Sequence, residues 1–211
     1  MDERFCIYCF REREDLESLL FNEVLLCPDC QQQFVEHKQS YRIDGVLYHV
    51  LYEYNDFLQG LFFQYKEQRD VVLAPVFLDL AKDLKKKFKK YHVCGMCSSE
   101  EKRMIRGFEP LIEIFGSIGV RVSSPFFKVT NSKQSSRSRK EREHIEEEIF
   151  LKSLRFIDSR PICLVDDVMT TGATLHRGVE LLHPDCVFVI AAHPLWIKQH
   201  QKKRVYSRFF Y

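Results

Sequence analysis

Four cysteines near the N-terminus have the spacing of a metal site. They form two Cys-x2-Cys pairs with 17 residues between them, at Cys6, Cys9, Cys27 and Cys30. A two-residue turn can bring both sulfurs of a pair to about 2.3 Å from one ion, and four thiolates leave no open position for water or substrate. We therefore predict a structural Zn²⁺ that supplies much of the folding energy of a short N-terminal module. The alternative is four ordinary buried cysteines.

A second motif follows the apolar run that ends at Val165. It consists of two acids, an apolar pair and a threonine-rich turn: Asp166, Asp167, Val168, Met169, Thr170, Thr171, Gly172, Ala173 and Thr174. Backbone N–H groups from Met169 to Thr174 can converge on a phosphate, and the dipole of a following helix favours the anion. The two carboxylates would repel a phosphate, so we predict that they bind ribose hydroxyls or Mg²⁺.

Two other interpretations of this motif follow from its residue types. An apolar strand that ends in two aspartates is also found in P-loop ATPases, but that class needs a Gly-Lys-Ser or Gly-Lys-Thr loop. None of the eight glycines is followed by lysine, which excludes it. A strand-end turn with capping Asp and Thr residues and no ligand is the remaining alternative.

The elements around the motif indicate an α/β fold. The run Pro161 to Val165 predicts a buried strand, 172–182 a helix, and Cys186 to Ala192 the next strand. Strand, helix, strand predicts a doubly wound domain with a parallel sheet, helices on both faces, and the motif at the strand's carboxyl end, where such sheets bind ligands. We expect this domain to span 41–211, after a zinc-binding module at 1–40.

The segments between the two motifs are predicted to contain a mixture of helices, short strands and a loop. The stretch from Tyr41 to Lys90 is aromatic-rich and then amphipathic, which favours mainly helix. Short strands are predicted near 92–96, 120–122 and 125–130, a helix near 111–118, and a mobile polar loop at 131–140. Cys94 and Cys97 are interpreted as a strand end and a loop, since an isolated pair is a weak metal signal.

The net charge of +2 is unevenly distributed. Residues 1–36 hold nine acids and three arginines, which leaves a balance of +8 for the remaining 175 residues. Lysine and arginine cluster at 82–90, 133–142 and 198–208, as suits a polyanion such as nucleic acid or a phosphorylated sugar, although solvated helix faces look the same. The sequence contains no run long enough to span a membrane and no secretory signal, so we expect a cytoplasmic protein with reduced cysteines.

The stretch from Ile162 to Thr174 resembles the phosphoribosyl pyrophosphate signature of type I phosphoribosyltransferases. With the four-cysteine knuckle, Arg106-Gly107-Phe108 and the basic segment 133–142, the whole chain resembles the ComF family of competence proteins. The resemblance implies a phosphoribosyltransferase-like domain behind a zinc finger, and binding of a nucleotide or of phosphoribosyl pyrophosphate with Mg²⁺. It also implies a role in natural transformation with single-stranded DNA and a DNA-uptake helicase, in the cytoplasm or at the inner face of the membrane through partners.

Two departures from the family pattern leave open whether the protein catalyses a transferase reaction. Gly95-Met96-Cys97 stands where the family commonly has Pro-x-Pro, and Glu109-Pro110 stands where it has Asn-Gln. An alternative function is a nucleotide-salvage transferase acting on an unidentified base, and a third is a zinc-dependent interaction module on an inert scaffold. Five basic residues are candidate contacts for pyrophosphate or DNA, with plain solvent as the other possibility: Arg103, Arg106, Lys133, Arg137 and Arg142.

Overall fold

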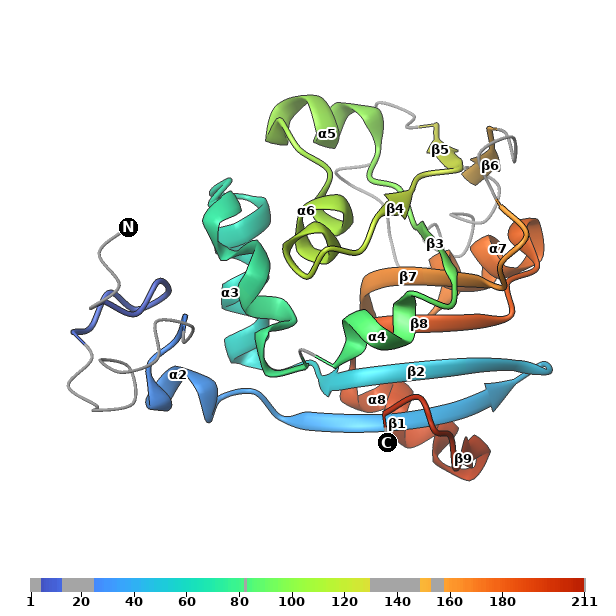
Figure 1. The fold of residues 1–211 in the computed structure, drawn as a ribbon, viewed down its shortest axis with the longest axis horizontal. Coiled ribbons are helices and arrows are strands. Elements are labelled where there is room, and N and C mark those ends of the chain that lie inside the picture. Colours follow the sequence, from blue (N-terminus) through green and yellow to red (C-terminus); the bar gives the residue numbers. More distant parts are fainter. Residues whose placement is uncertain (1–4, 13–24, 82, 130–148, 153–157, 211) are drawn as a thin grey trace.

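A seven-stranded sheet forms the centre of the protein. The computed structural model describes residues 5–12, 25–81, 83–129, 149–152 and 158–210. The strand order is β4-β3-β7-β8-β2-β1-β9 (Figure 1). The strands are β1 (Glu36–Ile43), β2 (Val46–Glu53), β3 (His92–Gly95), β4 (Val122–Ser123), β7 (Ile162–Met169), β8 (Cys186–Ala192) and β9 (Arg204–Val205). A separate two-stranded sheet pairs β5 (Phe126–Lys128) with β6 (Ile149–Leu151).

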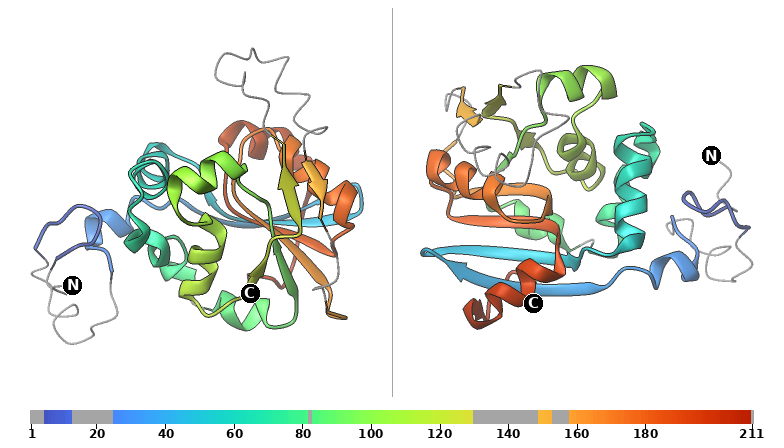
Figure 2. Two further views of the ribbon diagram at one scale, coloured as in Figure 1. Left: turned by 90° about the horizontal axis from the view of Figure 1, so that it is seen from above. Right: turned by 180° about the vertical axis from the view of Figure 1, so that it is seen from behind.

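Helices cover both faces of the large sheet (Figures 1 and 2). The α-helices are α2 (Pro28–Gln31), α3 (Asp56–Lys66), α4 (Leu84–Phe88), α5 (Glu100–Arg106), α6 (Pro110–Ser117), α7 (Ala173–Leu182) and α8 (Pro194–His200). The 3₁₀ helices are η1 (Val71–Phe77), η2 (Asp79–Ala81) and η5 (Gln201–Lys203). Phe188 on β8 contacts Phe88 of α4 and Phe115 of α6, whereas Tyr48 on β2 contacts Trp196 of α8 on the opposite face. The two faces therefore have separate aromatic cores.

The predicted fold class is confirmed, because the central strands are parallel. β8 pairs in parallel with both β7 and β2, and β3 pairs in parallel with β7 and β4. All seven residues of β8 are buried, as expected for a strand covered on both faces. Within the described part of the large sheet, only the edge formed by β2, β1 and β9 is antiparallel. The sheet is thus mostly parallel rather than wholly so.

The expectation of mainly helix from Tyr41 to Lys90 is wrong for its first third. This stretch begins inside a hairpin of β1 and β2, and helix starts only at Asp56, where the side chain of Asn55 caps the backbone N–H of Leu58 at 2.9 Å. Asp44 and Gly45 form the turn, with φ values of 48° and 87°. Asp-Gly between strands is a strong signal for a two-residue hairpin turn, and it outweighs the aromatic pattern.

The shorter expected elements appear as β3, α6, β4 and β5, and Cys94 and Cys97 lie on β3 and in the loop after it. The expected polar loop 131–140 lies outside the described residues. β1 begins at Glu36, so this strand crosses the boundary expected between residues 40 and 41. No helix in the described part of the chain has the length and apolar character to cross a membrane.

Candidate functional site

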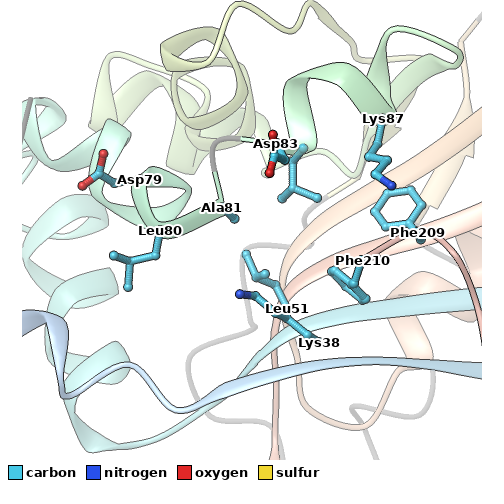
Figure 3. Close-up of a pocket in the computed structure, with 10 residues that line it drawn as sticks. Lys38, Leu51, Asp79, Leu80, Ala81, Asp83, Lys87, Phe209 and Phe210 are labelled. Atoms are coloured by element: carbon cyan, nitrogen blue, oxygen red, sulfur yellow. The ribbon is translucent and has the colours of Figure 1, made fainter.

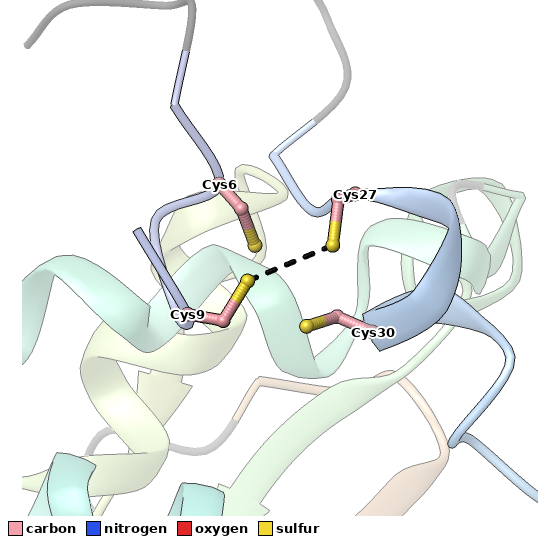
Figure 4. Close-up of side chains that lie close together, drawn as sticks. All are labelled: Cys6, Cys9, Cys27 and Cys30. Carbon is pink, nitrogen blue, oxygen red and sulfur yellow. Dashed lines mark hydrogen bonds between the residues drawn. The ribbon is translucent and has the colours of Figure 1, made fainter. Parts of the chain in front are cut away.

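The four N-terminal cysteines converge on one point (Figure 4). Their sulfur atoms all lie within 4.8 Å of one another, and the sulfurs of Cys9 and Cys27 are 3.7 Å apart. Tetrahedral zinc with bonds of about 2.3 Å places its sulfurs about 3.8 Å apart, so the cluster fits such an ion. The four residues can therefore hold one metal ion such as zinc, as the spacing predicts.

Backbone contacts shape the two cysteine turns. The N–H of Phe10 donates to the carbonyl of Cys6 at 2.9 Å, and the N–H of Cys30 donates to that of Cys27 at 3.0 Å. Burial raises the pKa of the Cys6 thiol, but backbone N–H groups outweigh it and lower the pKa to about 7. These donors favour the thiolate, which is the form that binds metal.

The turn that holds Cys6 and Cys9 packs against the first half of α3. The ring of Phe57 contacts the rings of Tyr8 and Phe34 at 5.1 and 5.2 Å, both nearly at right angles. A Cβ atom on Gly60 would lie 3.3 Å from the hydroxyl of Tyr8, so the two segments are closely apposed there. The metal module and the sheet domain thus share an aromatic contact through α3.

The acidic pair lies in the second half of β7, which continues to Met169. β3 ends at Gly95, opposite Val165, so β7 continues beyond its neighbour and Asp166 and Asp167 stand at the sheet's edge on that side. The backbone N–H of Asp167 donates to Oδ1 of Asp166 at 3.0 Å, and that of Val168 donates to Oδ1 of Asp167 at 2.7 Å. Both aspartates are half-buried.

The two carboxylates differ in their surroundings. Burial, and then the charge of Asp167, raise the pKa of Asp166 to about 7, while Lys66 opposes them. Asp167 forms an ion pair with Lys66 at the end of α3, and the two side chains are 17% and 19% exposed. Asp167 therefore has a cationic partner, whereas Asp166 is close to gaining a proton at neutral pH.

The threonine-rich turn joins β7 to α7 through a glycine-dependent conformation. Gly172 caps α7 with a φ of 87°, and a Cβ atom there would lie 3.2 Å from Nε1 of Trp196. Thr170 and Thr171 are exposed, Val168, Ala173 and Thr174 are half-buried, and Met169 is buried. The first N–H groups of α7 lack partners within the helix, and together with the hydroxyls they offer donors to an anion.

A pocket of about 190 Å³ opens beside the aspartates. Its wall includes the loop Met96–Ser99 after β3, and four cationic side chains: Lys66, Lys102, Arg106 and Lys128. Carboxylates and cations that line the same pocket suit a ligand that has both hydroxyl donors and phosphate groups.

The candidate arginines have different positions. Arg106 is 9% exposed, and its guanidinium donates to the carbonyl of Lys66 at 3.0 Å and to the Glu67 carboxylate at 2.8 Å. It therefore ties α5 to α3 while also lining the pocket. Arg103 is exposed and lines a neighbouring pocket of about 540 Å³. Lys133, Arg137 and Arg142 lie outside the described residues.

The neighbouring pocket shares Cys97, Ser98, Glu109 and Lys128 with the aspartate pocket. It adds Lys152 and the exposed ring of Phe127, which stacks on Phe150 at 5.3 Å. Sequence reasoning missed Lys66, Lys102, Lys128 and Lys152, because no local pattern separates these lysines from ordinary surface lysines.

A third hollow, of about 330 Å³, lies between η2, α4 and the C-terminal aromatic residues (Figure 3). Asp79 and Leu80 stand on one side of it, and Lys87 and Phe209 on the other. It shares no lining residue with the aspartate pocket, so we do not include it in the site.

Comparisons with known proteins agree with the sequence resemblance. No protein-family model matches the chain. It is 31% identical over 156 residues to "Competence protein ComFC" of Streptococcus pneumoniae, a match that covers 74% of this chain and 68% of the relative. It is 28% identical over 135 residues to "Competence protein ComFC" of Bacillus subtilis, covering 63% of this chain and 56% of the relative.

Among solved structures, a hypoxanthine phosphoribosyltransferase of Staphylococcus aureus matches with a TM-score of 0.30 and 15% identity. That match covers 68% of this chain and 71% of the other. The relationship rests instead on the S. pneumoniae protein, whose match extends over more than two thirds of both sequences. On that basis, the chain belongs to the ComFC family of competence proteins.

Proposed function

We propose that this protein binds a ribose 5-phosphate compound, either phosphoribosyl pyrophosphate or a nucleotide, at the segment from Asp166 to Thr174. The observation that carries the proposal is the pair of aspartates in the second half of β7 beside a pocket lined by cations. In this assignment, the aspartates accept hydrogen bonds from ribose hydroxyls, and the turn at Gly172 with the start of α7 binds the 5-phosphate.

The pyrophosphate group would lie beside cations that line the pocket. Lys102 and Lys128 line it together with the loop Met96–Ser99. A pyrophosphate carries several negative charges, and Mg²⁺ commonly accompanies such groups in proteins. We therefore propose that Mg²⁺ enters with the ligand, held by its phosphate oxygens.

We further propose a role for this site in natural transformation, on single-stranded DNA and together with a helicase. The names of the two relatives support a role in competence. Arg103, Lys128 and Lys152 supply positive charge next to the exposed Phe127 ring, and charge combined with an aromatic face is a common means of binding single strands.

Calorimetry on the full chain tests the ribose-phosphate proposal. Phosphoribosyl pyrophosphate with Mg²⁺ and ribose 5-phosphate are titrated separately into the wild type and into Asp166→Asn/Asp167→Asn. Hydrogen bonds to a carboxylate contribute about 1.5 to 3 kcal/mol each, so the double variant should bind at least about tenfold more weakly.

The matched control is Asp83→Asn, because the Asp83 side chain, at the N-cap of α4, is 90% exposed and lines no part of the aspartate pocket. This variant should bind as the wild type does. Circular dichroism checks that the double variant is folded. A wild type that binds neither compound, or a folded double variant with unchanged affinity, would contradict the proposal. Release of pyrophosphate during the titration would show that the protein hydrolyses phosphoribosyl pyrophosphate, since no acceptor base is present.

A further inference from the structure

The structure assigns Lys66 a specific role in this site: we propose that it positions Asp167 so that the pocket selects ribose over 2-deoxyribose. This inference rests on the proposed function, since it concerns how the same site recognises a hydroxyl of the sugar. Lys66 is a positioning residue here, acting on the ligand through the Asp167 carboxylate.

Both oxygens of the Asp167 carboxylate are engaged. Oδ1 accepts the backbone N–H of Val168 at 2.7 Å, and Oδ2 pairs with the Nζ of Lys66. One contact on each oxygen fixes the plane of the carboxylate, and the remaining lone pairs are left in defined directions. The side chain is 17% exposed, so water competes little for these positions.

Lys66 is itself held from two sides. Its ammonium lies 4.9 Å from the centre of the Phe62 ring, which is 4% exposed and stacks on Phe77 at 4.4 Å. Its carbonyl accepts the Nε–H of Arg106 at 3.0 Å. A side chain that is packed on a buried ring, at a helix end held by a buried arginine, has little freedom to leave Asp167.

An oriented carboxylate can distinguish sugars that differ by one hydroxyl. A site built to hydrogen-bond a hydroxyl binds the analogue without it poorly, because its own polar group then loses a partner. Without Lys66, the N–H of Val168 would still contact Oδ1 of Asp167, but Oδ2 would lose its partner. Lys66 keeps the Asp167 carboxylate oriented, which maintains this discrimination.

Among the described residues, Lys66 is the cation paired with Asp167. Lys102 lines the same pocket from α5, where it is exposed. The two lysines therefore have different expected effects. Lys66 should affect the recognition of the sugar hydroxyl, whereas Lys102 should affect only the binding of a pyrophosphate. Lys102→Met is accordingly the matched control for Lys66→Met.

The test compares ribose 5-phosphate with 2-deoxyribose 5-phosphate by calorimetry on the zinc-loaded full chain. We expect the wild type to prefer the ribose compound by about tenfold, the value of one hydrogen bond to a carboxylate. Lys66→Met should reduce this ratio to below about twofold, and Lys66→Arg should largely retain it. Lys102→Met should leave the ratio unchanged, because Lys102 lines the proposed pyrophosphate region and neither compound carries a pyrophosphate.

The outcomes separate this inference from the function on which it rests. If Lys66→Met is folded and keeps the wild-type ratio, or if the wild type shows no preference while binding both sugars, the role of Lys66 is wrong and the ribose-phosphate site stands. If the wild type binds neither compound, both proposals fall. Should Lys66→Met not fold, Lys66→Gln keeps a polar end group and is judged by the same ratio.

Discussion

The ring of Tyr8 lies edge-on against the ring of Phe57, with centroids 5.1 Å apart and planes at 73°. Tyr8 stands between the first two cysteines, and Phe57 is in the first turn of α3. The same helix ends at Lys66, which pairs with Asp167. One helix therefore connects the metal cluster to the candidate ribose site.

This contact should be measurable as a coupling energy. Phe57→Ala should lower the free energy of unfolding by about 2 kcal/mol, less than a fully buried phenylalanine, and Tyr8→Ala by about 1 kcal/mol. A double-mutant cycle by urea unfolding should give a coupling of about 0.5 to 1.5 kcal/mol. Phe63→Ala, on an exposed face of α3, is the control and should have little effect. Additive effects of the Tyr8 and Phe57 changes would show that the contact does not stabilise the protein.

The metal cluster should hold one zinc ion per chain. Elemental analysis of purified protein should find about one equivalent, and Cys27→Ser/Cys30→Ser should lose it because two thiolates cannot complete the tetrahedral site. Cys97→Ser is the matched control, since Cys97 lies in the loop after β3 and is not part of the cluster. Zinc-free wild type, or full zinc in the double variant, would show that the four cysteines are ordinary buried residues.

The carboxyl of Asp166 should make the folded protein less stable as the pH rises. Burial, followed by the charge of Asp167, raises its pKa from 3.8 to about 7. Between these values the unfolded chain loses the proton while the folded chain keeps it, so the free energy of unfolding falls as the pH rises through this window. Asp166→Asn removes this loss, and its stability relative to the wild type should increase between about pH 4 and about pH 7, the window between the two pKa values.

Urea unfolding of both proteins at several pH values measures that difference. Burial lowers the pKa of His49 to about 4, so this histidine destabilises the fold as the pH falls. The histidine is present in both proteins and cancels in the comparison. A constant difference between variant and wild type across the range would show that Asp166 titrates normally.

Binding to single-stranded DNA should depend steeply on salt. The neighbouring pocket is lined by Glu100 and Glu109, and also by Arg103, Lys128, Lys152 and the aromatic ring of Phe127. Such basic and aromatic side chains contact phosphates and stack on bases without recognising a base sequence. Each phosphate contact contributes about 0.7 to the slope of log K against log salt for single strands, so Lys128→Ala/Lys152→Ala should reduce the slope by about 1.4.

Fluorescence anisotropy at several salt concentrations measures this slope. Lys86→Ala, an 82% exposed lysine on α4, is the matched control and should leave it unchanged. Binding that does not respond to salt, or that prefers one base sequence strongly, would contradict a charge-dominated interface. An equal effect of the control would place the DNA on another basic surface.

Local motifs predicted the parts of the site that are contiguous in the sequence. Each cysteine pair is separated by two residues, and the segment from Asp166 to Thr174 is continuous in the sequence. The elements that hold this segment, β7 and α7, have clear apolar patterns. Lys66 could not be found in this way, because it reaches Asp167 only through the placement of α3 against the sheet. Asp44-Gly45 is a hairpin signal in the sequence, and the turn that it forms is the reason why the start of the stretch from Tyr41 to Lys90 is not helical.

Gly172→Ala should disturb both stability and ligand binding. Gly172 has a φ of 87°, a conformation that costs a residue with a Cβ atom about 1 to 3 kcal/mol. The new methyl group would also lie 3.2 Å from Nε1 of Trp196, so the turn would have to shift away from α8. Because this turn presents the proposed phosphate donors, a shift should weaken ribose 5-phosphate binding in addition to lowering the free energy of unfolding.

Gly116→Ala is the matched control for this change. Gly116 lies within α6, and a Cβ atom there meets no other atom within 4 Å. Alanine is the better helix former by about 1 kcal/mol, so this variant should be as stable as the wild type or slightly more so, with unchanged binding. Calorimetry and urea unfolding of both variants decide the matter. If Gly172→Ala matches the wild type in both measurements, the turn does not require glycine and the phosphate is bound elsewhere.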